Sequence, residues 1–300
     1  MSNFHVIAGA GGMPTSLDVR RIGYADLGEA LRRGIDDFMT KPSHYVFLCL
    51  IYPLIGVVLA AWTSGNNALP MLFPLMAGFA LIGPLAGVGL YEISRRREFG
   101  MDTSWRHALE VRHAPSIPSI VAMGVYLLCL FVAWLLVAKA IYVWQFGDVA
   151  PASAGNFFRD LFTTHQGWMV ILYGNIAGFV FAVIVLATTV IAFPLLLDRD
   201  AGAYEAVATS FRAVATNPGP MAAWGLIVAA ALVVGSIPIF AGLAIVVPIL
   251  GHATWHLYRK LVGPSAAPAR QTRPRVENAT LKHTPPLCRP LGEISESKRR

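Results

Sequence analysis

Long apolar stretches alternate with short polar segments along most of this chain. Each stretch is about as long as the roughly 20 helical residues that cross a hydrocarbon core. A backbone in lipid must satisfy its own hydrogen bonds, so each stretch is predicted to be a helix. The pattern predicts an all-α membrane protein with six transmembrane helices. These cover residues 43–63, 68–91, 117–143, 168–197, 219–236 and 238–258.

Composition strengthens the membrane interpretation. Hydrophobic residues make up 55% of the chain and charged residues 14%, whereas a soluble domain carries about 25% charged residues. So few charges cannot cover a water-facing surface, and we expect the lipid bilayer to cover part of it. Two cysteines, Cys49 and Cys129, fall inside predicted spans, which favours a packing role over a disulfide framework.

Basic residues are confined to alternate polar segments. Of the 24 Lys and Arg residues, 22 lie before the first span or in 95–112, 199–212 and 259–300. By the positive-inside rule these segments, and both termini, are cytoplasmic. The net charge of +7 is therefore a topology signal. Because the charges are spread over four segments, we expect no nucleic-acid partner.

An internal repeat predicts amphipathic helices on the cytoplasmic surface. "EALRRGIDDFMTKP" (29–42) and "EAVATSFRAVATNP" (205–218) match at a constant offset, and 102–118 is a weaker copy. Each copy ends near a proline, because the residue before proline leaves the helical region. The apolar positions at helical spacing are Leu27, Leu31, Ile35 and Phe38 in the first copy and Tyr204, Val207, Phe211 and Val214 in the second.

A second repeat marks the ends of spans and predicts three hairpins of one orientation. "GPLAGVGLYEISRR" (83–96) matches "VPILGHATWHLYRK" (247–260). Proline should bend these helices, and the glycine one turn later should allow a close helix neighbour. We expect Tyr91 and Trp255 at the headgroup level and the following basic pairs in water. The expected helix-bend and packing residues are Pro84, Gly87, Pro194, Pro248 and Gly251.

Four polar residues at the cytoplasmic ends of spans one, two and six are candidate metal ligands. They are His44, Glu92, His252 and His256. His252 and His256 share one helix face, and a ring of hairpins would bring all four together as a zinc or copper site. Position at a span end also explains each of them singly, and we favour that interpretation over a metal site.

Two features concern the opposite side of the membrane. Lys139 lies within apolar sequence, which makes it either a functional candidate or a side chain that snorkels to the interface. "NFFRDLF" (156–162) predicts a helix with an apolar face that rests on the outer surface, or a partner-binding loop. The segments 1–18 and 263–300 are predicted to be disordered tails, the second basic and Pro-rich.

The span-end motifs and the Pro-ended surface helices resemble an uncharacterised family of predicted bacterial inner-membrane proteins, known as a domain of unknown function. The resemblance covers about residues 20–262. It implies a six-span protein of the bacterial cytoplasmic (inner) membrane. The family has no established activity, so the resemblance implies no site residues.

No nucleotide-binding loop, G-x-S-x-G or H-E-x-x-H motif occurs in the chain. We therefore expect no enzyme, no catalytic residue and no cofactor. The first hypothesis is an accessory or scaffold protein with other membrane proteins as partners. A transporter or channel for an apolar or lipid-like cargo is one alternative, although the P-x-[DE]-x-x-[KR] motif of mitochondrial carriers is absent. A metal-handling protein that uses the His cluster is the other.

Overall fold

The computed structural model describes residues 17–40, 58, 69–103, 116–149, 151–199, 201–238 and 240–263. Contacts divide the chain into two compact units, 1–265 and 266–300. All described residues belong to the first unit. The predicted first span except Val58, the candidate ligand His44, and nearly all of both predicted tails lie outside the described residues.

The described part of the chain is helical and contains no strand, which confirms the predicted all-helical class there. The elements are α2 (Tyr24–Thr40), η1 (Leu69–Met71), α5 (Leu72–Leu81), α6 (Gly83–Ala86), α7 (Val88–Glu98), α9 (Ile117–Phe146), α10 (Ala154–Thr163), α11 (His165–Thr189), α12 (Ala192–Asp198), α13 (Ala203–Thr216), α14 (Pro218–Ser236) and α15 (Leu243–Val262).

Among the described residues, three helices are long and apolar enough to cross a membrane: Ile117–Phe146, His165–Asp198 and Pro218–Ser236. The second combines α11 and α12. The predicted span 68–91 is divided among η1, α5, α6 and α7, of which Leu69–Gly78 forms a shorter apolar helix. Helix α15 is not among the candidate spans, and its C-terminal half carries polar side chains that are buried inside the protein.

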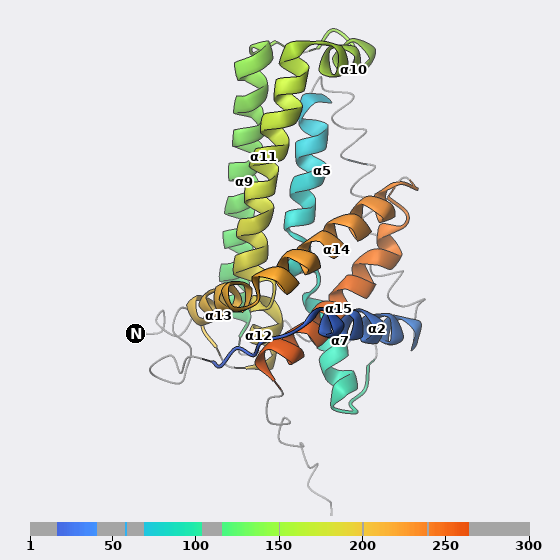
Figure 1. Cartoon of the computed structure of the whole chain (residues 1–300), viewed down its shortest axis with the longest axis vertical. Helices are drawn as coiled ribbons and strands as arrows, with labels where there is room; N and C mark the ends of the chain where they lie inside the picture. The colour runs from blue at the N-terminus through green and yellow to red at the C-terminus, as the bar shows by residue number, and fades with distance from the viewer. Residues whose placement is uncertain are drawn as a thin grey trace, which may run out of the picture. The chain divides into compact units, whose positions relative to one another are not determined.

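Helices α9 and α11 lie side by side in opposite directions, with α5 alongside them and α10 across their shared end (Figure 1). A stripe at helical spacing on α9 is buried; its members are Met123, Leu127, Trp134 and Ala138. Trp134 Nε1 donates a hydrogen bond to the carbonyl oxygen of Pro74 at 2.7 Å, and its ring contacts Phe181 edge-on. The other faces of α9 and α11 expose large apolar side chains, as lipid-facing helices do.

Two of the three expected bends coincide with breaks between helices. Pro84 lies at the start of α6, just after α5 ends, and Pro194 lies in the first turn of α12, after α11 ends. Proline lacks a backbone N–H and its ring clashes with the carbonyl four residues back, which interrupts a helix. Pro248 lies inside α15, which continues on both sides of it.

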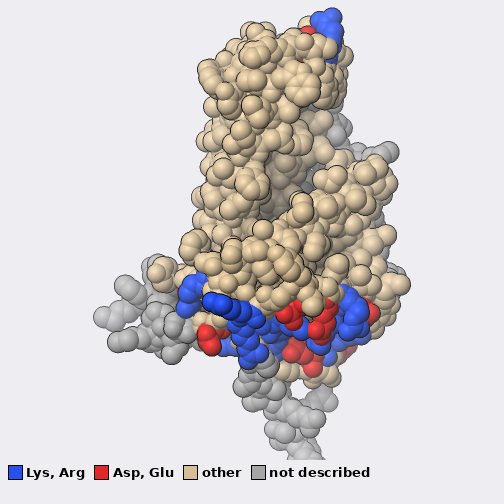
Figure 2. Space-filling model, viewed as in Figure 1, with Lys and Arg blue, Asp and Glu red and all other residues tan. Residues whose placement is uncertain are grey.

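Charged side chains gather at one end of this unit, over α2, α7, α12, α13 and the last turns of α15 (Figure 2). We call this the charged end. The opposite end, where α10 joins α9 to α11, is called the far end. Among the described residues, the far end carries the basic side chain of Arg159.

The apolar residues of the two surface helices are divided between the protein interior and its surface. In α2 the buried residues are Leu27, Ala30, Gly34, Asp37 and Phe38, while Ile35 is 40% exposed. In α13, Tyr204 and Phe211 are exposed and the small residues Ala206, Ser210 and Ala213 are buried. In both helices small side chains face the protein, because they allow the backbones to approach closely.

Candidate functional site

A buried carboxylate joins three helices at the charged end. Asp37 of α2 is 6% exposed. Its Oδ2 accepts a hydrogen bond from Ser94 Oγ of α7 at 2.6 Å and lies 2.9 Å from His256 Nε2 of α15. Its Oδ1 accepts from Arg97 Nη1 at 2.8 Å. The side chain of Asp37 thus fixes α2 against both α7 and α15.

The hydrogen bonds also define the tautomer of His252, which is fully buried. Ser94 Oγ lies 2.8 Å from His252 Nδ1. A hydroxyl has one proton, and that of Ser94 goes to Asp37, since an ionised carboxylate only accepts. His252 Nδ1 therefore carries a proton and donates it to Ser94 Oγ. Hydrogen bonds run in one direction from His252 through Ser94 to Asp37.

This order of residues differs from that of a hydrolytic triad. In a triad the histidine lies between serine and carboxylate and removes the serine proton. Here Ser94 lies between His252 and Asp37, so its proton points away from the imidazole. Both Ser94 and His252 are also buried away from any substrate in solution. The arrangement holds helices together and does not activate a nucleophile.

The protonation of Asp37 reflects the same contacts. Burial by itself would raise the pKa of the Asp37 carboxyl, because desolvation disfavours the charged form. The hydrogen bonds from His256 and Ser94 outweigh burial, and the pKa of Asp37 lies below its ordinary value. Asp37 is therefore a carboxylate at neutral pH, and it can accept all three hydrogen bonds at once.

A second network lies beside the first and is centred on Arg259 of α15. Arg259 donates from Nη1 to Asp198 Oδ2 at 3.0 Å and from Nε to Glu98 Oε2 at 2.8 Å. Trp255 Nε1 donates to Glu98 at 3.1 Å, and Tyr258 OH donates to Asp198 at 2.7 Å. The Arg259 guanidinium also lies 5.3 Å from the centroid of the Trp255 ring.

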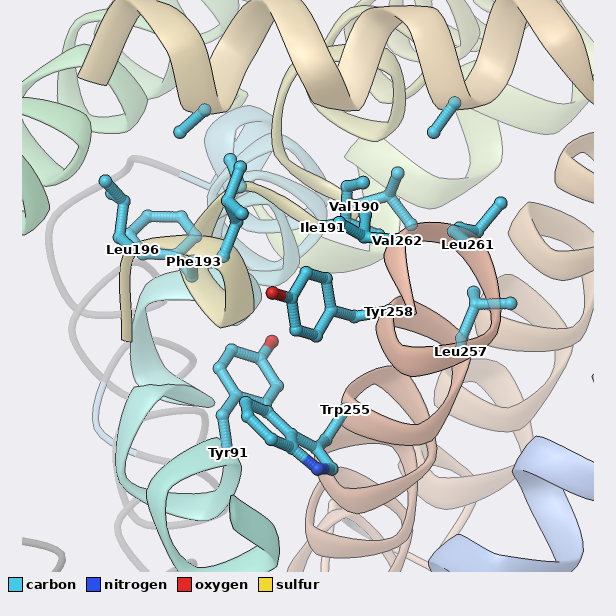
Figure 3. Close-up of a cluster of buried hydrophobic side chains, with 14 of the residues drawn as sticks. Tyr91, Val190, Ile191, Phe193, Leu196, Trp255, Leu257, Tyr258, Leu261 and Val262 are labelled. Atoms are coloured by element: carbon cyan, nitrogen blue, oxygen red, sulfur yellow. The ribbon is translucent and has the colours of Figure 1, made fainter. Parts of the chain in front are cut away.

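The surroundings of this network correct the expected exposure of Arg259 to water. Trp255 is fully buried, and the side chain of Arg259 is 9% exposed. Figure 3 shows Tyr258 of α15 and Tyr91 of α7 directed toward each other, and α12 contributes Phe193 to the same apolar cluster. Tyr91 and Trp255 therefore pack inside the protein, because α7, α12 and α15 cover one another, and Arg259 is not in water as expected.

Close backbone contacts bring the network helices together. A Cβ built on Gly34 of α2 would lie 2.6 Å from the backbone nitrogen of Ala253 of α15. A Cβ on Gly251 would lie 2.7 Å from Leu90 Cδ1 of α7. By contrast, the atom nearest to a Cβ on Gly87 belongs to Tyr91 of the same helix, at 2.6 Å. Gly34 and Gly251 thus permit the two crossings that place Asp37, Ser94 and His252 within hydrogen-bonding distance.

The candidate metal ligands do not converge in the part of the chain that the structure describes. His252 and His256 both join the Asp37 network. Glu92 pairs instead with Arg95 and Arg96 of its own helix, each at 2.8 Å. Among the described residues no group of three or more His, Cys, Asp and Glu side chains has the arrangement of metal ligands.

Sequence reasoning missed Asp37, Ser94, Glu98 and Asp198. One signal was available for Asp37. It follows Gly34 at helical spacing and shares a face with Leu27 and Ala30. A stripe of small residues next to a carboxylate is typical of a face that packs against another helix and needs a polar partner there.

Comparison with known proteins identifies a family and nothing more specific. No curated protein and no solved structure matches the chain. Residues 72–198, from the start of α5 to the end of α12, match the family model described as "Predicted integral membrane protein (DUF2189)". Over these residues, which are less than half of the chain, the sequence matches a family of predicted integral membrane proteins of unknown function. The match confirms the expected resemblance there, including the motif at 83–96, and does not extend to the rest of the expected range 20–262.

Proposed function

We propose that this chain is a multi-pass protein of the bacterial cytoplasmic membrane that acts as a scaffold for other membrane components. The observation that carries the proposal is the closure of the charged end. Asp37, Glu98 and Asp198 are each bonded to side chains from other helices. Polar groups used in this way stabilise a platform and are not available for chemistry on a substrate.

The proposed topology has six spans arranged as three hairpins, with both termini in the cytoplasm. The gathering of Lys and Arg at the charged end supports a cytoplasmic position for that end. The pairs α9–α11 and α14–α15 each leave the charged end and return to it (Figure 1), as the hairpin plan requires. The proposed first span and both tails would complete this arrangement.

Transport of an apolar cargo is the weaker alternative. A pocket of about 450 Å³ lies at the charged end, between the segment before α2 and helix α13. Its lining is largely polar and consists of Leu17, Asp18, Val19, Arg212 and Thr216. Such a pocket, open to water beside charged residues, does not suit an apolar cargo.

A site-specific crosslinking experiment tests the scaffold role at native expression. A photo-crosslinking amino acid is placed at Met39, which is exposed on α2 at the charged end. The matched control carries it at Leu226, which is equally exposed but lies on the apolar helix α14. The proposal predicts a discrete adduct with another membrane protein at Met39 and only lipid adducts at Leu226.

Two results would contradict the scaffold role. The first is a protein that is monomeric in mild detergent and forms no protein adduct from Met39. The second is exchange of a labelled lipid or small amphiphile by vesicles that contain the purified protein, at a rate above that of empty vesicles. The second result would support the transport alternative.

A further inference from the structure

The register between α9 and α11 places two polar side chains within about one helical turn of the same level. Three contacting pairs define that register: Trp144 with Tyr173, Trp134 with Phe181, and Tyr126 with Thr188. From one pair to the next, the residue number falls by 10 and then 8 on α9 and rises by 8 and then 7 on α11, so both positions move away from the far end by similar steps. Lys139 of α9, between Trp134 and Trp144, therefore lies level with residues 176–178 of α11, and Asn175 lies within one helical turn of that level, toward the far end.

Lys139 and Asn175 are exposed on candidate spans that are otherwise apolar. The amide nitrogen of Asn175 donates to the carbonyl oxygen of Ile171 at 2.7 Å, which leaves its amide oxygen turned outward. From the start of α9 at Ile117 to Lys139 the helix rises by roughly 33 Å. This rise matches the hydrocarbon thickness of about 30 Å. A bilayer whose one surface lies at the charged end therefore has its other hydrocarbon edge near Lys139 and Asn175.

Aromatic side chains follow directly beyond that level. Trp144 is 69% exposed and Trp168 is 54% exposed. Trp144 lies only five residues beyond Lys139, a rise of about 7 Å. Tryptophan and tyrosine concentrate at this depth, where the ring meets the headgroup layer and the ring nitrogen can reach water.

Helix α10 lies across the same end and has a matching apolar face. Ser153 caps its N-terminus by accepting a hydrogen bond from the backbone nitrogen of Asn156 at 3.2 Å. Phe158 and Phe162 are exposed on one face of the helix, and Asn156 lies on the opposite face. A short helix with an exposed phenylalanine face suits the boundary between headgroups and acyl chains.

We propose that α10 and the far ends of α9 and α11 form an interfacial cap that binds the phospholipid headgroup layer opposite the charged end. Lys139 and Asn175 mark the hydrocarbon edge, and the cap occupies the layer beyond it. The depth measured along α9 favours lipid over a protein partner, because the exposed tryptophans of the described residues, Trp144 and Trp168, both lie just beyond the level where the hydrocarbon ends. The cap would hold the α9–α11 hairpin at a fixed depth.

Spin-label accessibility in nanodiscs of phosphatidylethanolamine and phosphatidylglycerol tests the cap. Cys49, Cys129 and Cys288 are replaced by serine, and a nitroxide is attached to Phe162→Cys. Asn156→Cys, on the opposite face of α10, is the matched control. We expect the Phe162 label to collide with oxygen and not with a water-soluble nickel chelate, and the Asn156 label to collide with the chelate.

Either of two other patterns would overturn the proposal. Chelate access at Phe162 equal to that at Asn156 would place the face in water. Protection of the Phe162 label from both reagents would mean that protein covers it.

A measurement that keeps the native cysteines compares the native chain with Trp144→Phe/Trp168→Phe in brominated lipids. The fluorescence that the double variant lacks comes from Trp144 and Trp168. Lipids brominated near the headgroup should quench this fluorescence more than lipids brominated at the bilayer centre. Stronger quenching from the bilayer centre would overturn the proposal.

Discussion

The Nε2 atom of His256 lies 2.9 Å from Oδ2 of Asp37, although 219 residues separate them in the sequence. The contact joins the first described helix to the last one. Because Ser94 and Arg97 bond the same carboxylate, α7 is part of the same junction. The charged end is thus held together by a few buried polar groups on helices that are far apart in the chain.

Replacing Asp37 by alanine should destabilise the protein. Its hydrogen-bonding partners would lose their acceptor, and leaving buried donors unsatisfied costs about 1–3 kcal/mol. Asp36→Ala is the control, because Asp36 is exposed and its contact with Arg32 is an exposed ion pair worth at most about 1 kcal/mol. Thermal unfolding in detergent measures both. Equal losses in the two variants would show that the Asp37 network does not stabilise the fold.

Acid should weaken the native protein more than an Asp37→Asn variant. The folded pKa of Asp37 lies below its ordinary value of 3.8, so the unfolded chain binds the proton more tightly. The stability from this carboxylate is therefore complete above that value and is lost as the pH falls through the lower folded pKa. Melting temperatures measured from neutral pH down to about pH 3 test this. Asp26 and Glu29 also have lowered pKa values, but they titrate in both proteins and so affect both equally. If the melting temperatures of the two proteins fell in parallel as the pH is lowered, the prediction would be contradicted.

Gly34→Ala should separate α2 from α15. The added methyl would meet the backbone of Ala253 at 2.6 Å, and backbone atoms cannot move aside as a flexible side chain can. Overpacking of this kind costs typically 1–3 kcal/mol, about 2 kcal/mol here. Gly28→Ala on the same helix is the control, since no atom lies within 4 Å of its Cβ. That change should stabilise α2 by roughly 0.5–1 kcal/mol. Unfolding measurements that rank the two variants the other way would refute the close crossing.

Arg259→Lys should be harmful although it keeps the charge. The guanidinium bonds Asp198 and Glu98 at once and stacks on Trp255, and an ammonium cannot reproduce this planar geometry. We expect a loss of roughly 1–3 kcal/mol in unfolding free energy. Arg33→Lys, at an exposed pair with Glu29, should change stability by less than about 1 kcal/mol. If Arg259→Lys left the free energy of unfolding unchanged, Arg259 would contribute only its charge to the second network.

The local pattern of apolar residues was sufficient to predict the long apolar helices. Helix α9 begins at the predicted Ile117, and α14 covers Pro218–Ser236 against a predicted 219–236. Length and hydropathy decide such segments, because a span must be continuous and apolar whatever it packs against. The same reasoning located helices at both copies of the surface repeat, α2 and α13.

The buried polar networks could not be predicted in the same way. The part of α2 that packs against α15 depends on the Gly34–Ala253 crossing, which is a tertiary contact, so the apolar spacing of α2 could not indicate that Gly34 and Asp37 are buried. The expected exposure of Arg259 to water followed the general rule for span ends. Arg259 is buried instead, because α7 and α12 cover this part of α15 and supply Glu98 and Asp198.

The sidedness of the two ends is the central claim, and cysteine labelling in intact cells tests it most directly. In a variant without Cys49, Cys129 and Cys288, single cysteines are placed at Val149, between α9 and α10, and at Met39 of α2, both exposed. A membrane-impermeant maleimide should label Val149→Cys in intact cells and Met39→Cys only after permeabilisation. Labelling of Met39→Cys in intact cells, with Val149→Cys protected, would contradict the account.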